Sequence, residues 1–196
     1  MSARDAGTRH VVVVGLMGVG KTTVGRALAD WLGWRLDDSD AEISAATGQT
    51  VRELADTIGV AEMHRLEGEH LLDGLAKADP SVICAAASVI DEPSCRAALR
   101  APDVLSIWLR GSPMTLAARF DDQPHRPRFG RDHVALLHDQ AAGREQRYAA
   151  SSSLVVEVDG VTQAAVILTV IDLVAGRGIV SSTHGRHLQG DSDATA

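Results

Sequence analysis

The stretch GLMGVGKTT, residues 15–23, decides how the rest of this sequence is expected to fold. It follows the apolar run Val11–Val14 and opens the amphipathic segment TTVGRALADWLGW. It fits the pattern G-x-x-x-x-G-K-[ST], in which small residues let successive backbone N–H groups converge on phosphate oxygens. The helix that starts there adds the positive end of its dipole. The stretch therefore predicts a phosphate-binding loop between a strand and a helix.

This loop is expected to hold ATP and part of a magnesium site. The Lys21 ammonium can reach the β- and γ-phosphates, and the Thr22 hydroxyl is a ligand for Mg²⁺. The alternative is a Gly-rich turn that merely carries a lysine, and the strand before it and helix after it disfavour that interpretation. The nucleotide-binding residues expected in the loop are Gly15, Gly18, Val19, Gly20, Lys21, Thr22 and Thr23.

Composition and charge narrow the class of protein. The 196-residue chain suits one domain, and its net charge of −7 argues against a nucleic-acid partner, which calls for a basic face. No stretch approaches the ~20 apolar residues of a membrane span, and the N-terminus lacks the apolar run of a signal peptide. We expect a cytoplasmic monomer that binds neither nucleic acid nor membranes, with Cys84 and Cys95 as reduced packing residues.

Strand-type and helix-type segments alternate after the loop. The expected strands are 10–15, 34–36, 81–87, 103–109 and 153–158, and the expected helices are 21–33, 40–46, 51–59, 61–77, 93–100, 113–120, 133–150 and 161–174. This alternation predicts a three-layer α/β/α fold around a mostly parallel sheet of about five strands. We expect one domain over residues 10–175 with a mobile lid at about 121–132, a flexible segment 1–9 and a disordered tail 176–196.

In such sheets, ligands gather at the carboxyl ends of the strands. That rule places the loop, Asp38, Asp40 and residues 85–87 around one crevice. An aspartate beside an acceptor hydroxyl can orient or deprotonate it. The alternative is that Asp38 and Asp40 only cap the short helix after the second strand.

At this point the sequence resembles a known family. GLMGVGKTTVGRALADWLGWRLDDSDAEI, residues 15–43, closely resembles the opening of shikimate kinases, including Gly25-Arg26 after the loop. TGQTVRELADTIGVAEMHRLEGE continues in register, and the likeness extends to Arg126-Pro127 and to R-x-x-x-Y at Arg144–Tyr148, over roughly residues 10–160. The resemblance implies a P-loop kinase fold and a transfer of phosphate from ATP, with Mg²⁺, to a hydroxyl of a small metabolite.

The resemblance also implies catalytic and metal-site roles. Asp38 matches the aspartate that orients Mg²⁺ through water, beside Thr22. Asp40 matches the carboxylate next to the acceptor hydroxyl, and Lys21, Asp40 and Arg126 form the implied catalytic set.

Three arginines match positions that contact the ligands. Arg119 and Arg126 match lid arginines near the nucleotide and the transferred phosphoryl group, and Arg144 matches an arginine that binds the substrate carboxylate. For Arg119 and Arg126 the alternative is a solvated loop charge.

Two positions on the substrate side depart from the family. The family arginine that holds the substrate carboxylate falls on His64, and a shift to Arg65 would turn the side chain by about 100° around a helix. The family Gly-Gly-Gly after the third strand is Ala85, Ala86 and Ala87. A lost charged hydrogen bond costs about 1.5–3 kcal/mol and an Ala at positive φ about 1–2, together about two to three decades of shikimate affinity. We therefore expect an intact nucleotide half and a rebuilt acceptor half.

The function that these residues favour is a shikimate kinase-like enzyme that uses ATP and Mg²⁺ on a small cyclic or sugar-like metabolite. The alternatives are a gluconate- or carbohydrate-type kinase and a nucleotide-binding protein with little catalysis. A GTPase-type switch is disfavoured, because the sequence has no guanine-specifying Asn-Lys-x-Asp stretch.

Overall fold

One parallel sheet forms the centre of the molecule. The computed structural model describes residues 7–121 and 133–179. Its five strands lie in the order β2-β3-β1-β4-β5, and all neighbouring strands are parallel. The strands are β1 (His10–Val14), β2 (Arg35–Asp38), β3 (Ser81–Cys84), β4 (Val104–Arg110) and β5 (Leu154–Glu157). The predicted α/β class and mostly parallel five-stranded sheet are confirmed.

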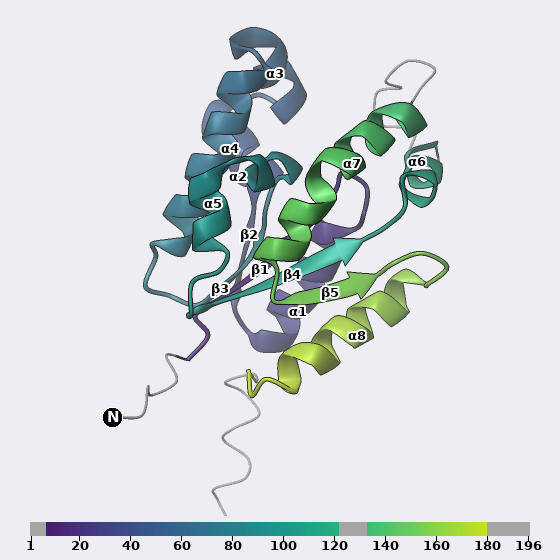
Figure 1. Cartoon of the computed structure of the whole chain (residues 1–196). Coiled ribbons are helices and arrows are strands. Elements are labelled where there is room, and N and C mark those ends of the chain that lie inside the picture. The colour runs from purple at the N-terminus through teal and green to yellow at the C-terminus, as the bar shows by residue number, and fades with distance from the viewer. Residues whose placement is uncertain (1–6, 122–132, 180–196) are drawn as a thin grey trace, which may run out of the picture.

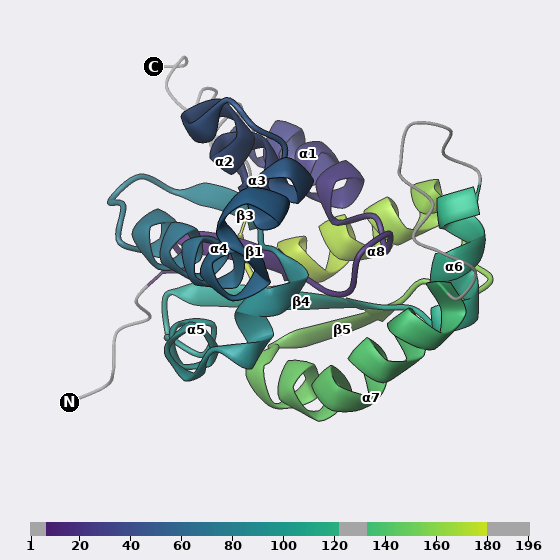
Figure 2. The same ribbon diagram turned by 90° about the horizontal axis from the view of Figure 1, so that it is seen from above.

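Helices cover both faces of this sheet. They are α1 (Lys21–Leu32), α2 (Ser39–Thr47), α3 (Val51–Ile58), α4 (Val60–Leu75), the 3₁₀ turn η1 (Ala87–Asp91), α5 (Pro93–Ala98), α6 (Pro113–Asp121), α7 (His133–Ser151) and α8 (Gln163–Ala175). Figures 1 and 2 show α1 and α8 on one face and α4, α5 and α7 on the other. Among the described residues, no helix combines the length and apolar character needed to cross a bilayer.

The central strand β1 is the most buried element. Val11, Val12, Val13 and Val14 are all fully buried, between β3 on one side and β4 on the other. A parallel strand with helices on both faces needs apolar side chains on both, which explains the uninterrupted valine run. The run thus places the loop that follows it at the middle of the carboxyl edge of the sheet.

Two glycines allow the backbone to pass close to its neighbours at this edge. Gly15 has φ +145°, and a Cβ there would lie 2.6 Å from the Leu109 carbonyl oxygen. A Cβ at Gly25 would overlap the sulfur of Cys84, so α1 packs directly on β3 only because this position has no side chain. Glycine at these two positions fixes the direction in which α1 leaves the loop.

A small separate apolar cluster holds α2, α3 and α4 together. Ile43, Leu54 and Met63, one from each helix, are buried against one another. The predicted cap of α3 is present: the Thr50 hydroxyl accepts from the Glu53 amide, and the Glu53 carboxylate accepts from the Thr50 amide. α3 lies beyond the carboxyl end of β2, whereas α4 runs back along the face of the sheet (Figure 1).

The prediction of a third strand over 81–87 is wrong at its carboxyl end. The strand stops at Cys84, and the chain turns into η1 at Ala87. The Ala85 amide still donates to the Val13 carbonyl at 3.1 Å, but β1 ends one residue later. Because β1 has ended at Val14, residues 86 and 87 have no neighbouring strand on that side with which to form hydrogen bonds. The ends of the other predicted elements differ by at most two residues.

A buried carboxylate joins β2 to α4. The side chain of Asp37 is 1% exposed; its Oδ1 is 2.7 Å from His70 Nε2 and its Oδ2 accepts from Lys77 Nζ at 3.1 Å. Burial alone would raise the pKa of Asp37, but the hydrogen bonds and charges of His70 and Lys77 outweigh it and lower the pKa to about 2. This carboxylate therefore stabilises the fold above its ordinary pKa, and the contribution is lost as the pH falls toward about 2.

We expect Asp37→Asn to destabilise the protein at neutral pH by roughly 2 kcal/mol, because a charged pair of hydrogen bonds is weakened. Thermal unfolding followed by circular dichroism should show a Tm lower by about 4–8 °C. The deficit should shrink as the pH is lowered from 4 to about 2.

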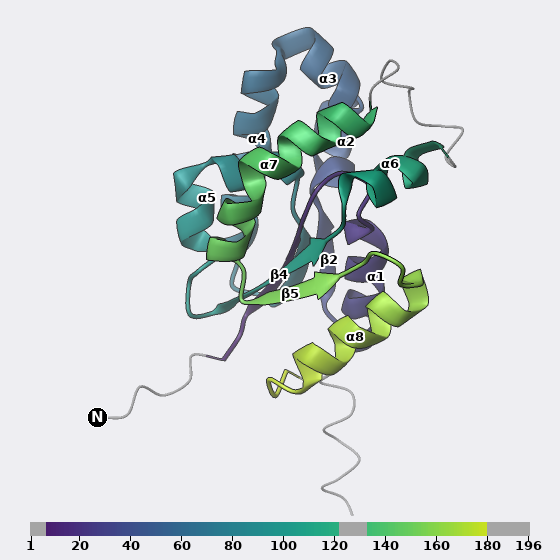
Figure 3. The ribbon, with the colours of Figure 1, turned by 45° about the vertical axis from the view of Figure 1, so that its right-hand side comes forward.

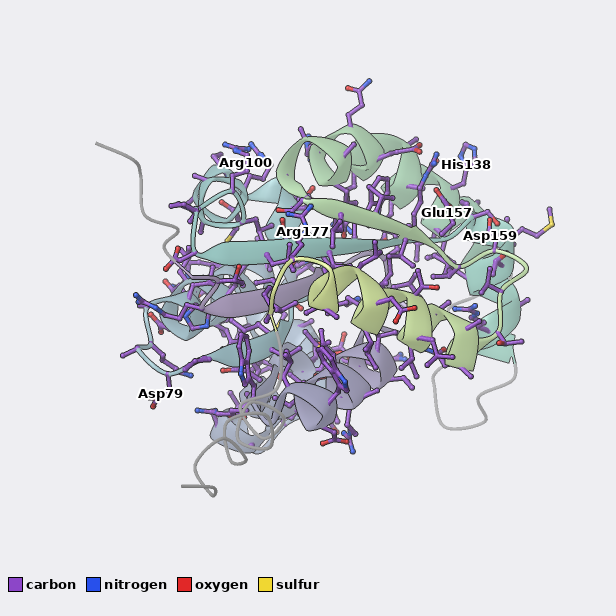
Figure 4. All side chains as sticks on the ribbon, turned by 90° about the horizontal axis from the view of Figure 1, so that it is seen from below. Asp79, Arg100, His138, Glu157, Asp159 and Arg177 are labelled. Atoms are coloured by element: carbon purple, nitrogen blue, oxygen red, sulfur yellow. The ribbon has the colours of Figure 1, made fainter. Side chains whose placement is uncertain are left out.

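Asp79→Asn is the control, since Asp79 is exposed in the turn between α4 and β3 and projects away from the sheet (Figure 4). It should leave Tm within the change of an ordinary surface substitution. Equal Tm values for wild type and Asp37→Asn at pH 7 would contradict the stabilising role.

Candidate active site

A cavity of about 370 Å³ opens at the carboxyl edge of the sheet. The loop after β1, the ends of β2 and β3, and helices α4, α6 and α7 surround it. Helices α6 and α7, which flank residues 122–132, contact each other beyond the ends of β4 and β5 (Figure 3). The structure brings these predicted site residues to the cavity wall: Gly18, Gly20, Lys21, Thr22, Thr23, Asp38, Asp40, His64, Ala85, Ala86, Ala87, Arg119 and Arg144.

Lys21 is the first residue of α1, directly after the predicted phosphate-binding loop. Its Nζ donates to the carbonyl oxygens of Gly15 at 3.0 Å and Leu16 at 3.2 Å. Burial lowers the pKa of Lys21, and the charges of nearby groups, Asp40 foremost, only partly offset this. An ammonium held by two backbone carbonyls in this way is positioned to meet an anionic phosphate. Gly15 and Val19 belong to the same loop but do not line the cavity.

Asp38 supports the metal-site prediction and also the alternative to it. It is the N-cap of α2, where Oδ1 accepts from the Ala41 amide at 3.4 Å. Its other oxygen, Oδ2, is buried and has no hydrogen-bond partner in the described part of the chain. A buried carboxylate oxygen without a partner, in the cavity that Thr22 also lines, fits a cation site. The described residues contain no cluster of three or more His, Cys, Asp or Glu side chains able to bind a metal ion.

Asp40 lies in the first turn of α2 and faces the same cavity. Its carboxylate is close enough to the Lys21 ammonium to raise the pKa of that group, against the effect of burial. The predicted acceptor-side carboxylate and the predicted phosphate-binding lysine therefore line one cavity.

Arg119 is not a solvated loop charge. Its Nη1 donates to the Val19 carbonyl at 3.2 Å and its Nη2 to the Val158 carbonyl at 3.3 Å. The side chain thus joins α6 to the phosphate loop and to the residue after β5. Arg126, the other predicted lid arginine, and the rest of the lid after Asp121 lie outside the described residues.

Of the two residues considered for the substrate side, His64 and Arg65, only His64 lines the cavity. His64 lines the cavity, whereas Arg65 lies on the exposed side of α4 and is paired with Glu62 and Glu69. The expected turn of about 100° between adjacent helical positions separates the two side chains.

The alanines of the acceptor loop are accommodated without backbone strain. Among the described residues, no residue other than glycine has positive φ, and Ala86 has φ −60° and ψ 153°. The expected cost of an alanine at positive φ is therefore wrong, because the turn into η1 uses ordinary dihedrals. All three alanines line the cavity, and Ala85 and Ala86 are buried.

Arg144 reaches the cavity from α7, and Asp91 at the end of η1 holds it. Both Nε and Nη2 of Arg144 donate to Asp91 Oδ2, at 2.9 and 2.6 Å. One turn after Arg144, the buried Tyr148 donates to the Ala87 carbonyl at 2.9 Å. These contacts tie α7 to the acceptor loop.

Comparison with protein-family models shows the family of this chain. The model described as "Shikimate kinase" matches residues 17–175. The chain belongs to the shikimate kinase family. It is 34% identical to the shikimate kinase of Paramagnetospirillum magneticum over 165 residues, 81% of each chain. It is 39% identical over 127 residues to that of Thiobacillus denitrificans, covering 65% of this chain and 66% of that one.

Solved structures agree on the fold. A shikimate kinase from Acinetobacter baumannii in complex with shikimate superposes with a TM-score of 0.76 at 24% identity, covering 86% of this chain and 94% of that one. A gluconokinase from Sinorhizobium meliloti gives a TM-score of 0.56 at 20% identity, covering 89% and 98%. Family membership confirms the predicted kinase class, with a hydroxyl group as acceptor and ATP and Mg²⁺ as cofactors.

Sequence reasoning missed three polar residues of this shikimate kinase family site. Glu67, Ser88 and Gln140 line the cavity. Helical spacing could have revealed two of them, because Glu67 is three residues after His64 and Gln140 is four residues before Arg144. Ser88 carries no comparable signal, since its position depends on the 3₁₀ turn.

Glu67 is the most buried acid of the cavity wall. It is 7% exposed and accepts a hydrogen bond from the Ser88 hydroxyl. Burial, together with the negative charge of Asp40, raises the pKa of Glu67, whereas the Ser88 hydrogen bond and the positive charge of Lys21 act in the opposite direction. Folding therefore favours the protonated acid, and the stability of the wild type falls as the pH rises from the ordinary carboxyl range toward the pKa in the folded state.

We expect Glu67→Gln to gain stability relative to the wild type as the pH rises from 4 to 8. Glutamine cannot ionise, so the cost of a buried charge is absent, and each kcal/mol relieved raises Tm by about 2–4 °C. Differential scanning calorimetry at several pH values measures this. Glu69→Gln, an exposed position on the same helix, serves as the control, and a Tm difference between Glu67→Gln and wild type that does not change with pH would contradict the expectation.

Proposed function

We propose that this protein transfers the γ-phosphoryl group of ATP to a hydroxyl of a small, multiply hydroxylated metabolite, with shikimate as the first acceptor to test. One observation supports the proposal: the loop with Lys21 lines the same cavity as Asp40, His64 and Glu67. Donor and acceptor held in one cavity supply the positioning that phosphoryl transfer mainly requires.

The roles of the donor residues follow from their chemistry. The loop amides and Lys21 bind the phosphates, and Arg119 holds the loop against the end of β5. Thr22 and Asp38 would hold Mg²⁺, which would supply positive charge to the phosphate oxygens. Arg126 would add positive charge where the transition state carries spread negative charge.

Asp40 acts on the acceptor. Its carboxylate accepts the proton of the attacking hydroxyl, or orients that hydroxyl, as the oxygen bonds to phosphorus and ADP leaves. The position of Asp40 on the wall of the cavity that Lys21 also lines supports this role.

We also propose that residues 10–175 act as one kinase domain in a cytoplasmic monomer without nucleic-acid or membrane partners. The acidic net charge of −7 supports the absence of a nucleic-acid partner. Size-exclusion chromatography with light scattering tests the monomer, for which a mass of 20.7 kDa is expected.

A coupled assay of ADP release tests the activity with ATP, Mg²⁺ and a panel of shikimate, shikimate methyl ester, gluconate and uncharged cyclitols. Turnover that depends on one of these acceptors is expected. ATP binding without turnover of any acceptor would instead support a nucleotide-binding protein that lacks catalysis, and preferred turnover of gluconate would support the carbohydrate-kinase alternative.

Asp40→Asn should lower kcat with the best acceptor by about 10²–10⁴-fold, the range that a general base contributes. ATP affinity, measured by calorimetry, should stay near the wild-type value because Asp40 is on the acceptor side. Asp30→Asn, on the exposed side of α1, is the matched control and should retain full kcat. An unchanged kcat in Asp40→Asn would exclude Asp40 as the base.

A further inference from the structure

Arg144 lines the cavity and is paired with Asp91, which lies behind it at the end of η1. Arg144 uses one full edge of its guanidinium, Nε and Nη2, on a single oxygen of Asp91. The side chain of Arg144 is 12% exposed and that of Asp91 31%, so the pair is partly shielded from water. Asp91 Oδ1 also accepts from Arg147 at 2.7 Å, but the side chain of Arg147 is 48% exposed and its charge is largely solvated.

The other lysine and arginine side chains described near the cavity have hydrogen-bond or ion-pair partners of their own. Among the described residues that line it, Lys21 faces the loop carbonyls and Arg119 faces the carbonyls of Val19 and Val158. Arg65 is paired with two glutamates and points away. Arg144 is therefore the guanidinium that an acceptor carboxylate would meet in the described part of the cavity.

A guanidinium binds a carboxylate best through two parallel N–H donors. Asp91 already occupies the Nε–Nη2 edge of Arg144 and supplies a compensating negative charge. An acceptor carboxylate must compete with this internal carboxylate or share its arginine. Uncharged hydroxyl groups face no such competition: the buried Gln140 Oε1 has no partner within the described residues, and the Glu67–Ser88 pair offers further hydrogen-bonding groups.

We propose that Asp91 is a specificity-determining residue, which lowers the affinity of this site for carboxylated acceptors by occupying Arg144 and so favours uncharged polyols. The inference rests on the proposed function, because it assumes that the acceptor binds between Asp40 and Arg144. Asp91 does not contact the reacting atoms; it acts through the charge and donors of Arg144.

The test compares shikimate with its methyl ester, which keeps the ring and hydroxyls but lacks the negative charge. Calorimetry gives the dissociation constant of each for wild type, Asp91→Asn and the double variant Asp91→Asn/Arg144→Ala. Asp91→Asn should improve binding of shikimate relative to the ester by about tenfold, the effect of one charged hydrogen bond gained. The double variant should lose this gain, and the KM for ATP should be the same in wild type and Asp91→Asn.

Asp139→Asn controls for net charge, because it removes one carboxylate from an exposed position of α7 and should leave the ratio of the two constants unchanged. If Asp91→Asn does not give the thermal transition of a folded protein, Asp91→Ser removes the same charge. A ratio that stays constant in a folded Asp91 variant, or that moves toward the ester, would overturn the proposal.

The binding measurement does not depend on turnover. Failure of the proposed kinase activity would appear as absent ADP release with every acceptor. Failure of the specificity inference would appear as an unchanged ratio of dissociation constants in an enzyme that still turns over.

Discussion

The site depends on one steric constraint: the backbone of Gly15 lies very close to the carbonyl oxygen of Leu109. Only a residue without a side chain fits there, since a Cβ would lie 2.6 Å from that oxygen. This tight turn lets β1 end at the middle of the sheet edge and lets α1 begin six residues later with its N-terminus facing the cavity. The amide donors, the helix dipole and Lys21 then converge on the same space, which is why the donor half is built before any ligand arrives.

The acceptor half is organised by charges that satisfy one another. Arg144 pairs with Asp91, and Glu67 accepts from Ser88. A buried charge without a partner would be costly, so these internal pairs are the means by which the wall of the cavity stays folded. They also set what an acceptor can gain on binding, because each pair must be displaced or shared before a charged ligand benefits from it.

The substitution of alanines for glycines in the acceptor loop illustrates how a local rule depends on its surroundings. Three methyl groups at positive φ would strain the loop, and the sequence motif alone suggests that cost. The chain avoids this strain because β3 stops at Cys84 and β1 ends beside Ala85. The turn into η1 that follows uses dihedrals that alanine readily adopts. Tyr148 then fixes the turn by its bond to the Ala87 carbonyl.

The sequence by itself determined the order of strands and helices, the phosphate loop, the cap of α3 and the family, because each depends on residues close together in the chain. It also indicated Asp38, Asp40 and His64, because motif spacing and strand ends are local features. Only the tertiary structure decided that Asp91 occupies Arg144, 53 residues away, and that Glu67 is buried against Ser88, 21 residues away. No local pattern records such pairs, since their distance depends on how η1, α4 and α7 pack together.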